Sequence, residues 1–325
     1  MNVLVVGGAG YIGSHMVQLL LDAGHRPVTY DSLVTGYRDA VPGGDFVQAD
    51  LGDRAALDHV LRHHAIEAVM HFASYIQVGE SVREPGKYYH NNFSNTLALL
   101  DAMVRAGVGR FIFSSTAAIF GEPEYVPIDE AHPQRPINPY GASKLMVERA
   151  LRDYDHAHGL RSVCLRYFNA AGAHPRGHIG ERHEPETHLI PLLLQVAGGR
   201  REHVSVFGRD YDTPDGTCIR DYIHVMDLCQ AHLLALAWLA DGGASSAFNL
   251  GNGNGFSVLE VVESVRRVTQ RPVAIQDAQR RAGDPARLVA DSRLVRSTLG
   301  WAPQFDDLET IVAHAWAFER AFRRL

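Results

Sequence analysis

Lysine and cysteine are both scarce in this sequence of 325 residues. Only Lys87 and Lys144 are lysines, and arginine supplies nearly all the other positive charge. The three cysteines, Cys164, Cys218 and Cys229, are an odd number and form no Cys-x-x-Cys pair. This pattern excludes a disulfide framework and favours a reduced, cytoplasmic setting.

Long apolar runs and an excess of positive charge are also missing. Polar residues interrupt the apolar stretches, so we expect neither a signal peptide nor a membrane span. The net charge of -6 argues against nucleic-acid binding. The hydrophobic fraction of 46% and the charged fraction of 21% are ordinary for a globular protein. The chain is long enough for one large domain or two closely joined ones.

Glycine, by contrast, is concentrated near the N-terminus. The apolar run 2–6 predicts a buried parallel strand, and Gly7-Gly-Ala-Gly-Tyr-Ile-Gly13 follows at once. A helical stretch over 14–23 and a second strand over 27–30 come next, and Asp31 follows that strand. This order of strand, glycine-rich turn, helix, strand and acid is typical of a dinucleotide-binding βαβ unit.

Each part of this unit has a physical role in binding a dinucleotide. The glycines permit a tight turn, a close approach of the backbone to a pyrophosphate, and close packing of helix on strand. The free N–H groups at the start of the helix attract the phosphates. Asp31 can accept hydrogen bonds from both hydroxyls of an adenosine ribose and would repel a 2′-phosphate. The predicted cofactor is therefore NAD rather than NADP.

Strands and helices continue to alternate, which predicts an α/β fold with a Rossmann-type doubly wound parallel sheet. The expected strands span 45–48, 68–72, 110–115 and 161–166, and the expected helices span 54–63, 88–106 and 139–158. Ligands of such folds bind beyond the carboxyl ends of the strands. The residues that follow predicted strand ends should therefore converge at one edge: Asp31, Asp50, Ala73, Thr116 and Asn169.

The amino-acid composition changes after about residue 172. Residues 173–217 are rich in histidine, proline, glycine and charge. Later elements are expected as helices over 189–197, 225–239, 257–269 and 308–323 and as a strand over 247–250. We predict an NAD-binding domain made of 1–172 plus about 218–251, and a smaller C-terminal substrate-binding lobe made of 173–217 plus about 252–325.

Lys144 lies four residues after Tyr140 on one of these helices. Asn138 is a good N-cap, Pro139 suits the first helical position, and Gly159 can end the helix. Residues four apart share a helix face, so Tyr140 and Lys144 can point into one site. A nearby ammonium lowers the pKa of a phenol and makes it an acid/base for the proton of an alcohol. An ordinary amphipathic helix can show the same spacing, so the pair indicates a catalytic site only in combination with the predicted NAD-binding turn before it.

Taken together, these features resemble the extended short-chain dehydrogenase/reductase family. More specific stretches, which run from residue 2 to about residue 291, are similar to the UDP-glucose 4-epimerases. They are Gly7 to His15, His71-Phe-Ala73 with Val78-Gly-Glu-Ser81, Arg166-Tyr-Phe-Asn169 with Gly172-Ala-His-Pro175, Asp215-Gly-Thr217, Arg220 to Asp227, and Arg281-Ala-Gly-Asp284. The resemblance implies an NAD-dependent isomerase that interconverts UDP-glucose and UDP-galactose by inversion at C4 through a 4-keto intermediate.

The resemblance also assigns roles to the matching positions. Tyr140 would be the acid/base for the sugar 4-hydroxyl, Lys144 would hold the nicotinamide ribose, and Thr116 would hydrogen-bond to the 4-oxygen. NAD is expected along Gly7, Gly10, Tyr11, Ile12, Gly13, Asp31, Asp50, Leu51, Phe72, Ala73, Asn91, Ser114, Tyr140, Lys144 and Tyr167. The UDP-sugar is expected at Thr116, Tyr140, Asn169, His188, Leu189, Phe207, Arg220, Arg281 and Asp284. Arginine side chains can fork onto the oxygens of a diphosphate, which agrees with these roles.

Other functions are compatible with the same fold. A nucleotide-sugar 4,6-dehydratase needs an Asp-Glu pair directly after the Ser/Thr, but Ala117 and Ala118 follow Thr116 and cannot move a proton. A UDP-glucuronate decarboxylase is disfavoured because the neighbourhoods of Leu189 and Arg281 are epimerase-like. A non-catalytic NAD-binding scaffold would be expected to lack the tyrosine–lysine pair.

Two positions leave the range of sugars open. Ile76 stands where some family members have lysine, and its effect is not predicted. Leu288 stands where some members have a bulky tyrosine, so a smaller side chain leaves space for a 2-N-acetyl group. We therefore expect activity on N-acetylated UDP-hexosamines as well, and a UDP-N-acetylglucosamine or UDP-glucuronate 4-epimerase stays as an alternative.

Metal binding is not expected from the histidines. The spacings of His174, His178, His183 and His188 do not suit a regular set of ligands, so loop and surface roles are the better account. A homodimer is implied by the resemblance alone, through the long helices at about 88–106 and 139–158.

Overall fold

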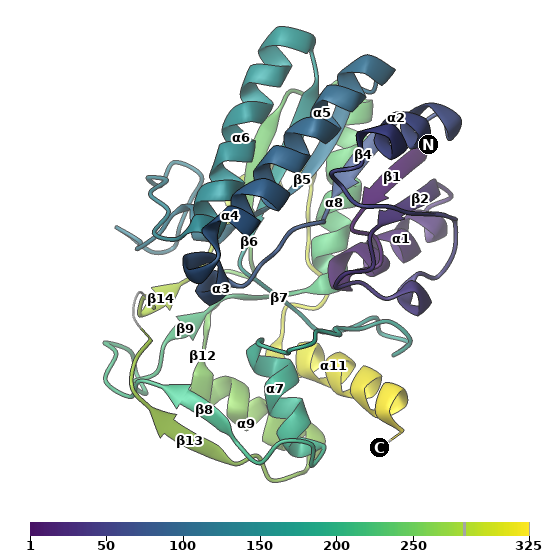
Figure 1. Cartoon of the computed structure of the whole chain (residues 1–325). Coiled ribbons are helices and arrows are strands. Elements are labelled where there is room, and N and C mark those ends of the chain that lie inside the picture. Colours follow the sequence, from purple (N-terminus) through teal and green to yellow (C-terminus); the bar gives the residue numbers. More distant parts are fainter. Residues whose placement is uncertain (282–283, 325) are drawn as a thin grey trace.

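A seven-stranded parallel sheet forms the centre of the larger lobe, in the order β11-β6-β5-β4-β1-β2-β3 (Figure 1). The computed structural model describes residues 1–281 and 284–324. The strands of this sheet are β1 (Asn2–Val6), β2 (Arg26–Asp31), β3 (Asp45–Gln48), β4 (Ala68–His71), β5 (Arg110–Thr116), β6 (Arg161–Tyr167) and β11 (Ser246–Leu250). The predicted Rossmann-type α/β fold is confirmed.

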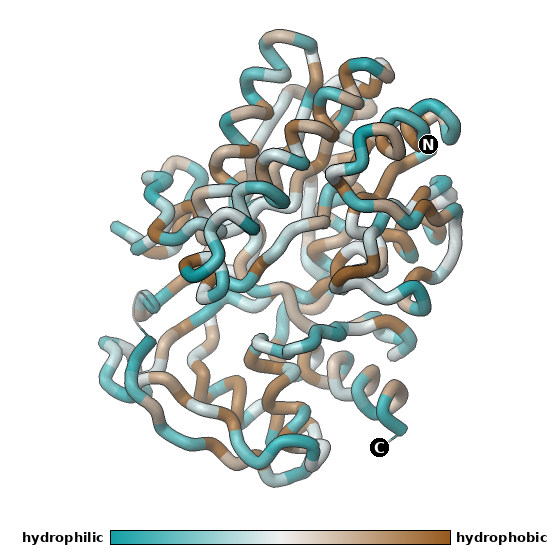
Figure 2. Tube along the Cα trace, viewed as in Figure 1, coloured by the Kyte–Doolittle hydropathy of each residue, from teal (hydrophilic) through white to brown (hydrophobic). Residues whose placement is uncertain are grey.

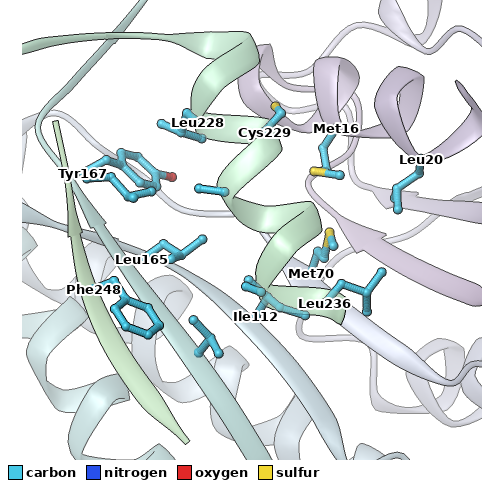
Figure 3. Packing of buried hydrophobic residues seen from close by; sticks show 14 of the residues in the cluster. Met16, Leu20, Met70, Ile112, Leu165, Tyr167, Leu228, Cys229, Leu236 and Phe248 are labelled. Atoms are coloured by element: carbon cyan, nitrogen blue, oxygen red, sulfur yellow. The ribbon is translucent and has the colours of Figure 1, made fainter. Parts of the chain in front are cut away.

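The apolar side chains of each strand point alternately to the two faces of the sheet, and helices cover both faces. Val3 and Val5 of β1 pack into a core with α1 (Tyr11–Asp22) and α8 (Val225–Ala240). Figure 3 shows side chains of these two helices and of the central strands meeting in this core. Leu4 and Val6 face the opposite core, which holds the helices α2 (Arg54–His63), α5 (Asn95–Ala106) and α6 (Pro139–His158).

The smaller lobe is built from short strands and three helices. Strands β8 (Val204–Phe207) and β13 (Ile275–Ala278) pair, and β9 (Ile219–Arg220) lies between β12 (Phe256–Ser257) and β14 (Arg287–Leu288). The helices α7 (Leu189–Ala197), α9 (Val258–Thr269) and α11 (Leu308–Arg323) enclose a separate apolar core. Figure 2 shows brown, hydrophobic segments toward the inside of both lobes and more teal segments outside.

The chain passes between the two lobes more than once. The strand β9 belongs to the sheet of the smaller lobe, whereas β7 (Asn169–Ala171) and β10 (Tyr222–His224) pair with each other. The helix α10 (Arg293–Leu299) returns to the larger lobe, where Val295 and Trp301 join the core beside α8. The domain boundaries stay a prediction.

The helix predicted over 88–106 is present, but its first part is a π-helix. After α3 (Val78–Arg83), α4 (Pro85–Tyr88) continues directly into a π-helix η2 (Tyr89–Ser94) and then into α5. The Asn92 amide accepts from the Tyr75 N–H at 2.9 Å and donates to the Tyr75 carbonyl at 3.0 Å. The wide turn thereby points a buried amide at the loop after β4, and π-turns are commonly found at functional sites.

Two 3₁₀ turns complete the elements, η1 (Arg38–Ala40) and η3 (Ala117–Ile119). None of the helices over residues 1–281 and 284–324 combines the length and hydropathy that crossing a membrane requires.

Candidate active site

The glycine-rich turn between β1 and α1 has the shape that a pyrophosphate requires. Gly7 has φ +81°, and a Cβ there would lie 2.5 Å from the backbone nitrogen of Ala73. A Cβ on Gly13 would lie 2.1 Å from the Gly7 carbonyl oxygen. A Cβ on Gly10 would meet nothing nearer than 3.4 Å, so the backbone there is accessible to a ligand. Gly10 also caps α1 without a side chain, which leaves N–H groups for an anion.

An open cavity begins at this turn and follows the carboxyl ends of β1, β2 and β4. Eight of the predicted cofactor residues line it: Gly7, Gly10, Asp31, Asp50, Leu51, Phe72, Ala73 and Asn91. At its far end the Asp31 carboxylate accepts hydrogen bonds from the N–H groups of Ala9, at 2.9 Å, and Leu33, at 2.8 Å. Burial raises the pKa of Asp31, and these two hydrogen bonds oppose the rise. The carboxylate is therefore held in place, with lone pairs left for ribose hydroxyls.

Sequence reasoning missed other residues that line the same cavity: Ser32, Val34, Thr35, Gly36, Ser74 and Tyr75. Each follows β2 or β4 within a few residues, so the rule on strand ends could have found them. Gly36 packs closely there, because a Cβ would lie 2.9 Å from the Ala9 Cβ and 3.0 Å from Asp31 Oδ1.

Four other predicted cofactor residues lie outside the cavity lining, two at the start of α1 and two at strand ends. The Tyr11 hydroxyl donates to the Gly172 carbonyl at 2.7 Å, and Ile12 packs against the core of the larger lobe. Ser114 and Tyr167, at the ends of β5 and β6, contact each other through their hydroxyls. The first contact joins the start of α1 to the loop after β7, and the second joins the ends of β5 and β6.

Helix α6 carries Tyr140, Lys144 and Glu148 on one face. Asn138 caps the helix by accepting from the Gly141 N–H at 2.9 Å, and Gly159 ends it in the left-handed conformation, as predicted. The Lys144 ammonium is 1% exposed and donates to Ser74 Oγ at 2.6 Å and to the Ser114 carbonyl at 2.7 Å. The spacing of four residues thus brings the lysine to the ends of β4 and β5.

A buried ion pair between Glu148 of α6 and Arg166 of β6 lies against this helix face. Arg166 of β6 donates to both oxygens of Glu148, at 2.6 and 3.0 Å, and both side chains are less than 5% exposed. Ser115 donates to the same carboxylate at 2.5 Å. No pattern in the sequence marked Glu148 as part of the site, although it continues the spacing of four from Lys144.

Two causes act on the pKa of the Tyr140 phenol in opposite directions. Burial raises the pKa of Tyr140, and the Thr116 side chain, rather than Lys144, opposes the rise. Burial lowers the pKa of Lys144 to about 7, and Glu148 acts against that change. The lysine donates its hydrogen bonds to Ser74 and to the end of β5, and its effect on the phenol pKa stays a prediction.

Thr116 ends β5 beside this pair. Its hydroxyl accepts from the Ala118 N–H at 3.1 Å, which starts the turn η3. Leu288 of β14 packs against the apolar group that contains Ala117, so the sugar-size position predicted from the sequence lies next to this turn. Ile76 is 39% exposed in the loop after β4.

The cations of the smaller lobe gather around β8, β9 and β14. Arg220 donates to the Ile219 and Pro285 carbonyls at 2.9 Å and lies 3.4 Å from the Asp284 carboxylate. The Arg281 guanidinium lies 3.8 Å above the Phe207 ring. The structure thus brings four of the predicted UDP-sugar residues into one lobe, while Ala282 and Gly283 of that motif lie outside the described residues.

The remaining predicted substrate residues lie at the start of β7 and at the start of α7. Asn169 starts β7 and donates to the Asp221 carbonyl at 2.9 Å. Leu189 is the first residue of α7, and His188 is its N-cap. The His188 ring contacts Glu181, a partner that the sequence did not indicate.

The comparisons with known proteins agree on one family. Residues 3–251 match the NAD dependent epimerase/dehydratase family. A UDP-glucose 4-epimerase of Streptococcus mutans is 53% identical over 325 residues, which cover 99% of this chain and 98% of the relative.

Solved structures give the same result for the fold. A UDP-glucose 4-epimerase from Brucella ovis in complex with NAD has a TM-score of 0.95 and 51% identity, and the match covers 97% of each chain. A UDP-glucose 4-epimerase from Bifidobacterium longum in complex with NAD+ and UDP has a TM-score of 0.94 and 36% identity, covering 99% of this chain and 98% of that one.

Proposed function

Since the chain belongs to the NAD dependent epimerase/dehydratase family, we propose that it interconverts UDP-glucose and UDP-galactose by inverting C4. The observation that carries this proposal is the helix face of Tyr140 and Lys144 beside Thr116, with only alanines directly after the threonine. This arrangement offers one acid/base for a reversible oxidation and no second acid for the loss of water.

Tyr140 takes the proton of the sugar 4-hydroxyl and later returns it. Bound NAD+ supplies the hydride acceptor that makes C4 a ketone for part of the cycle. Thr116 holds the 4-oxygen beside the phenol, and Lys144 positions the nicotinamide ribose. Because the pKa of the Tyr140 phenol is raised by burial, its ionised form needs a favourable charge close by, and a cationic nicotinamide ring would provide one.

The open backbone at Gly10 and the immobilised Asp31 carboxylate support binding of NAD in the cavity. Close packing around Gly7 and Gly13 keeps that turn in one conformation. A site fixed in advance loses little entropy on binding, which suits a cofactor that ends each cycle unchanged and stays with the protein.

Arg220 and Arg281 anchor the UDP part of the substrate. Inversion requires the keto sugar to turn over while the nucleotide stays bound, so the diphosphate must be held apart from the reacting carbon. Arg281 rests on an aromatic ring and has no carboxylate partner among the described residues, so its charge is available to a phosphate. Asp284 accepts from the ribose hydroxyls.

N-acetylated UDP-hexosamines are a second class of substrate. Leu288 beside the Ala117 turn supports this extension, because leucine is smaller than tyrosine and leaves space near the sugar. UDP-N-acetylglucosamine or UDP-glucuronate as the main substrate is the alternative within the same reaction class.

A panel of substrates tests these proposals. UDP-galactose, UDP-N-acetylgalactosamine and UDP-galacturonate are incubated with the purified protein without added NAD, and the products are separated by chromatography. Turnover of UDP-galactose is expected, with UDP-N-acetylgalactosamine as a second substrate. If only the galacturonate reacts, the main substrate is wrong; if nothing reacts and the protein carries NAD, the chain is a scaffold.

We further propose a homodimer formed through α5 and α6, and a cytoplasmic location. The location is supported by three free, buried cysteines. Sedimentation velocity should give twice the mass of one chain, and a monomer at micromolar concentration would rule out the dimer.

A further inference from the structure

Four metal-binding types of side chain meet in the loop between β7 and α7. They are Glu181, His183, Glu186 and His188, and one nitrogen or oxygen atom of each lies within 4.8 Å of the other three. The spacing of histidines alone did not reveal this group, because half of its members are glutamates. The rings of His174 and His178, which the same spacing included, meet edge-on with 4.3 Å between their centres.

The donor atoms of the four side chains lie near one another. His183 Nδ1 lies 3.1 Å from Glu181 Oε1 and 3.7 Å from Glu186 Oε2. His188 Nδ1 contacts Glu181 Oε1 and lies 3.8 Å from Glu186 Oε1. Two donors bound tetrahedrally to one ion at about 2.1 Å are about 3.4 Å apart. On binding an ion, the widest separation would therefore shorten by about 1.4 Å, and the close contact between His188 and Glu181 would widen.

The surroundings of the group leave its donors pointing inward. Glu181 and Glu186 are each 6% exposed, and His183 Nδ1 is buried without a well-oriented hydrogen bond. The Glu186 Oε1 atom accepts from the N–H groups of Thr187 and His188 at 2.7 and 2.8 Å, which turns Oε2 toward His183. Orientation of a ligand by such outer hydrogen bonds is common at metal sites. A buried nitrogen between two buried carboxylates needs either a proton or a metal ion to balance the charge.

We propose that Glu181, His183, Glu186 and His188 together bind one divalent transition-metal ion, with Zn²⁺ as the best match. Two carboxylates and two neutral imidazoles balance the charge of a dication, and both ligand types suit zinc. Four protein ligands leave no open coordination position, so the ion is structural rather than catalytic.

The ion would hold in place the part of the loop that contacts the larger lobe. Arg182 pairs with Asp39 at 2.9 Å and lies 3.8 Å above the Tyr37 ring, and the His183 ring meets Tyr11 edge-on with 6.4 Å between ring centres. At the other end, His188 is the N-cap of α7. The metal would thus join the start of α7 to the region of the glycine-rich turn.

The alternative to a metal ion is protonation of both histidines. Two protonated imidazoles would also balance the two carboxylates, as an ion-pair network that needs no metal. A direct measurement of metal binding separates the two.

The test uses the untagged full-length protein, stripped with a chelator and titrated with Zn²⁺. Bound zinc is measured by mass spectrometry after gel filtration, and Co²⁺ absorption in the visible region reports the coordination. One equivalent per chain is expected. His183→Ala and Glu181→Gln should each weaken zinc binding at least ~10-fold, whereas His59→Ala and His156→Ala, at exposed positions on α2 and α6, should not.

The content of bound NAD and the circular dichroism spectrum show whether each variant is folded. If His183→Ala does not fold, Glu181→Gln, which keeps the shape of the side chain, decides. Retention of less than about a tenth of an equivalent by the wild-type protein, or zinc binding that survives both ligand substitutions unchanged, would overturn the proposal in favour of the protonated network.

Discussion

Lys144 in the larger lobe and Arg281 in the smaller lobe are both cations above an aromatic ring, yet their surroundings differ. The Lys144 ammonium is buried, lies 4.8 Å from the centre of the Phe113 ring, and has two hydrogen-bond acceptors within 2.7 Å. Arg281 is exposed and lies 3.8 Å above the Phe207 ring. The first cation is fixed before any ligand binds, whereas the second is available to an anion that arrives from solvent.

The difference follows from how each lobe is built. The site in the larger lobe rests on the ends of long strands and on a 20-residue helix, with the Glu148–Arg166 pair beneath it. The site in the smaller lobe rests on strands of two to four residues. We therefore expect substitutions in the larger lobe to act on the rate of the chemical step and on stability, and substitutions in the smaller lobe to act on substrate binding.

The largest effect is expected from Tyr140→Phe. Removal of the phenol hydroxyl takes away the only acid/base that the proposal assigns, so kcat should fall ~10³-fold. Bound NAD, measured after denaturation of the protein, should be unchanged. Near-normal kcat would show that the proton moves by another route and that the fixed site is not the centre of the chemistry.

Glu148→Gln should give the largest loss of stability. The substitution leaves the Arg166 charge buried without its partner, which costs about 3–5 kcal/mol of the free energy of unfolding. Glu124→Gln is the matched control, because the Glu124–Arg135 pair has a similar distance of 2.6 Å but is exposed. Its loss should be below about 1 kcal/mol. Equal losses in urea unfolding would contradict the contrast between buried and exposed charges.

Arg281→Ala should change KM rather than kcat. The loss of one charge-assisted hydrogen bond to a phosphate corresponds to about 1.5–3 kcal/mol, or roughly a 10- to 100-fold rise in KM for UDP-galactose. The neighbouring Arg280 is the control, since it pairs with Asp210 at 2.7 Å. Arg280→Ala should leave KM within about twofold. A fall in kcat with unchanged KM for Arg281→Ala would place this arginine at the reacting centre instead.

The smallest effect is a pH dependence of stability. Burial lowers the pKa of Lys144 to about 7, from 10.5. Between these values the unfolded chain binds the proton and the folded chain does not, so this group makes the free energy of unfolding rise with pH, by at most about 1.4 kcal/mol per unit. Lys144→Met should lack that contribution. The free energies of unfolding of the wild-type protein and of Lys144→Met are compared by urea unfolding at pH 7 and pH 9. An equal change with pH in both proteins would contradict the contribution of Lys144.

The sequence alone predicted the larger lobe better than the smaller one, for a physical reason. The helix α6 follows from a local cap, a proline and a terminal glycine, and its bounds were found as predicted. Strands such as β8 and β13 pair across about 70 residues and have only four residues each. Their hydrogen bonds depend on distant partners, so no local pattern indicates them.

The same reason applies within the candidate site. The tyrosine–lysine pair and the glycine-rich turn are local motifs, and the structure brings both to the ends of parallel strands. The hydrogen bonds of Lys144, the support from Glu148, and the grouping of Glu181 with His188 depend on side-chain directions in the folded chain. Spacing along the sequence does not determine these directions.

The most direct test of the proposed reaction follows the hydrogen on C4. UDP-galactose is converted in D₂O without added NAD, and the product is examined by proton NMR. If C4 is oxidised and reduced within the closed site, the hydrogen returns as a hydride and UDP-glucose keeps a full proton signal at C4. Deuterium at C4 would mean that the hydrogen leaves as a proton exchanged with solvent, and would contradict the mechanism.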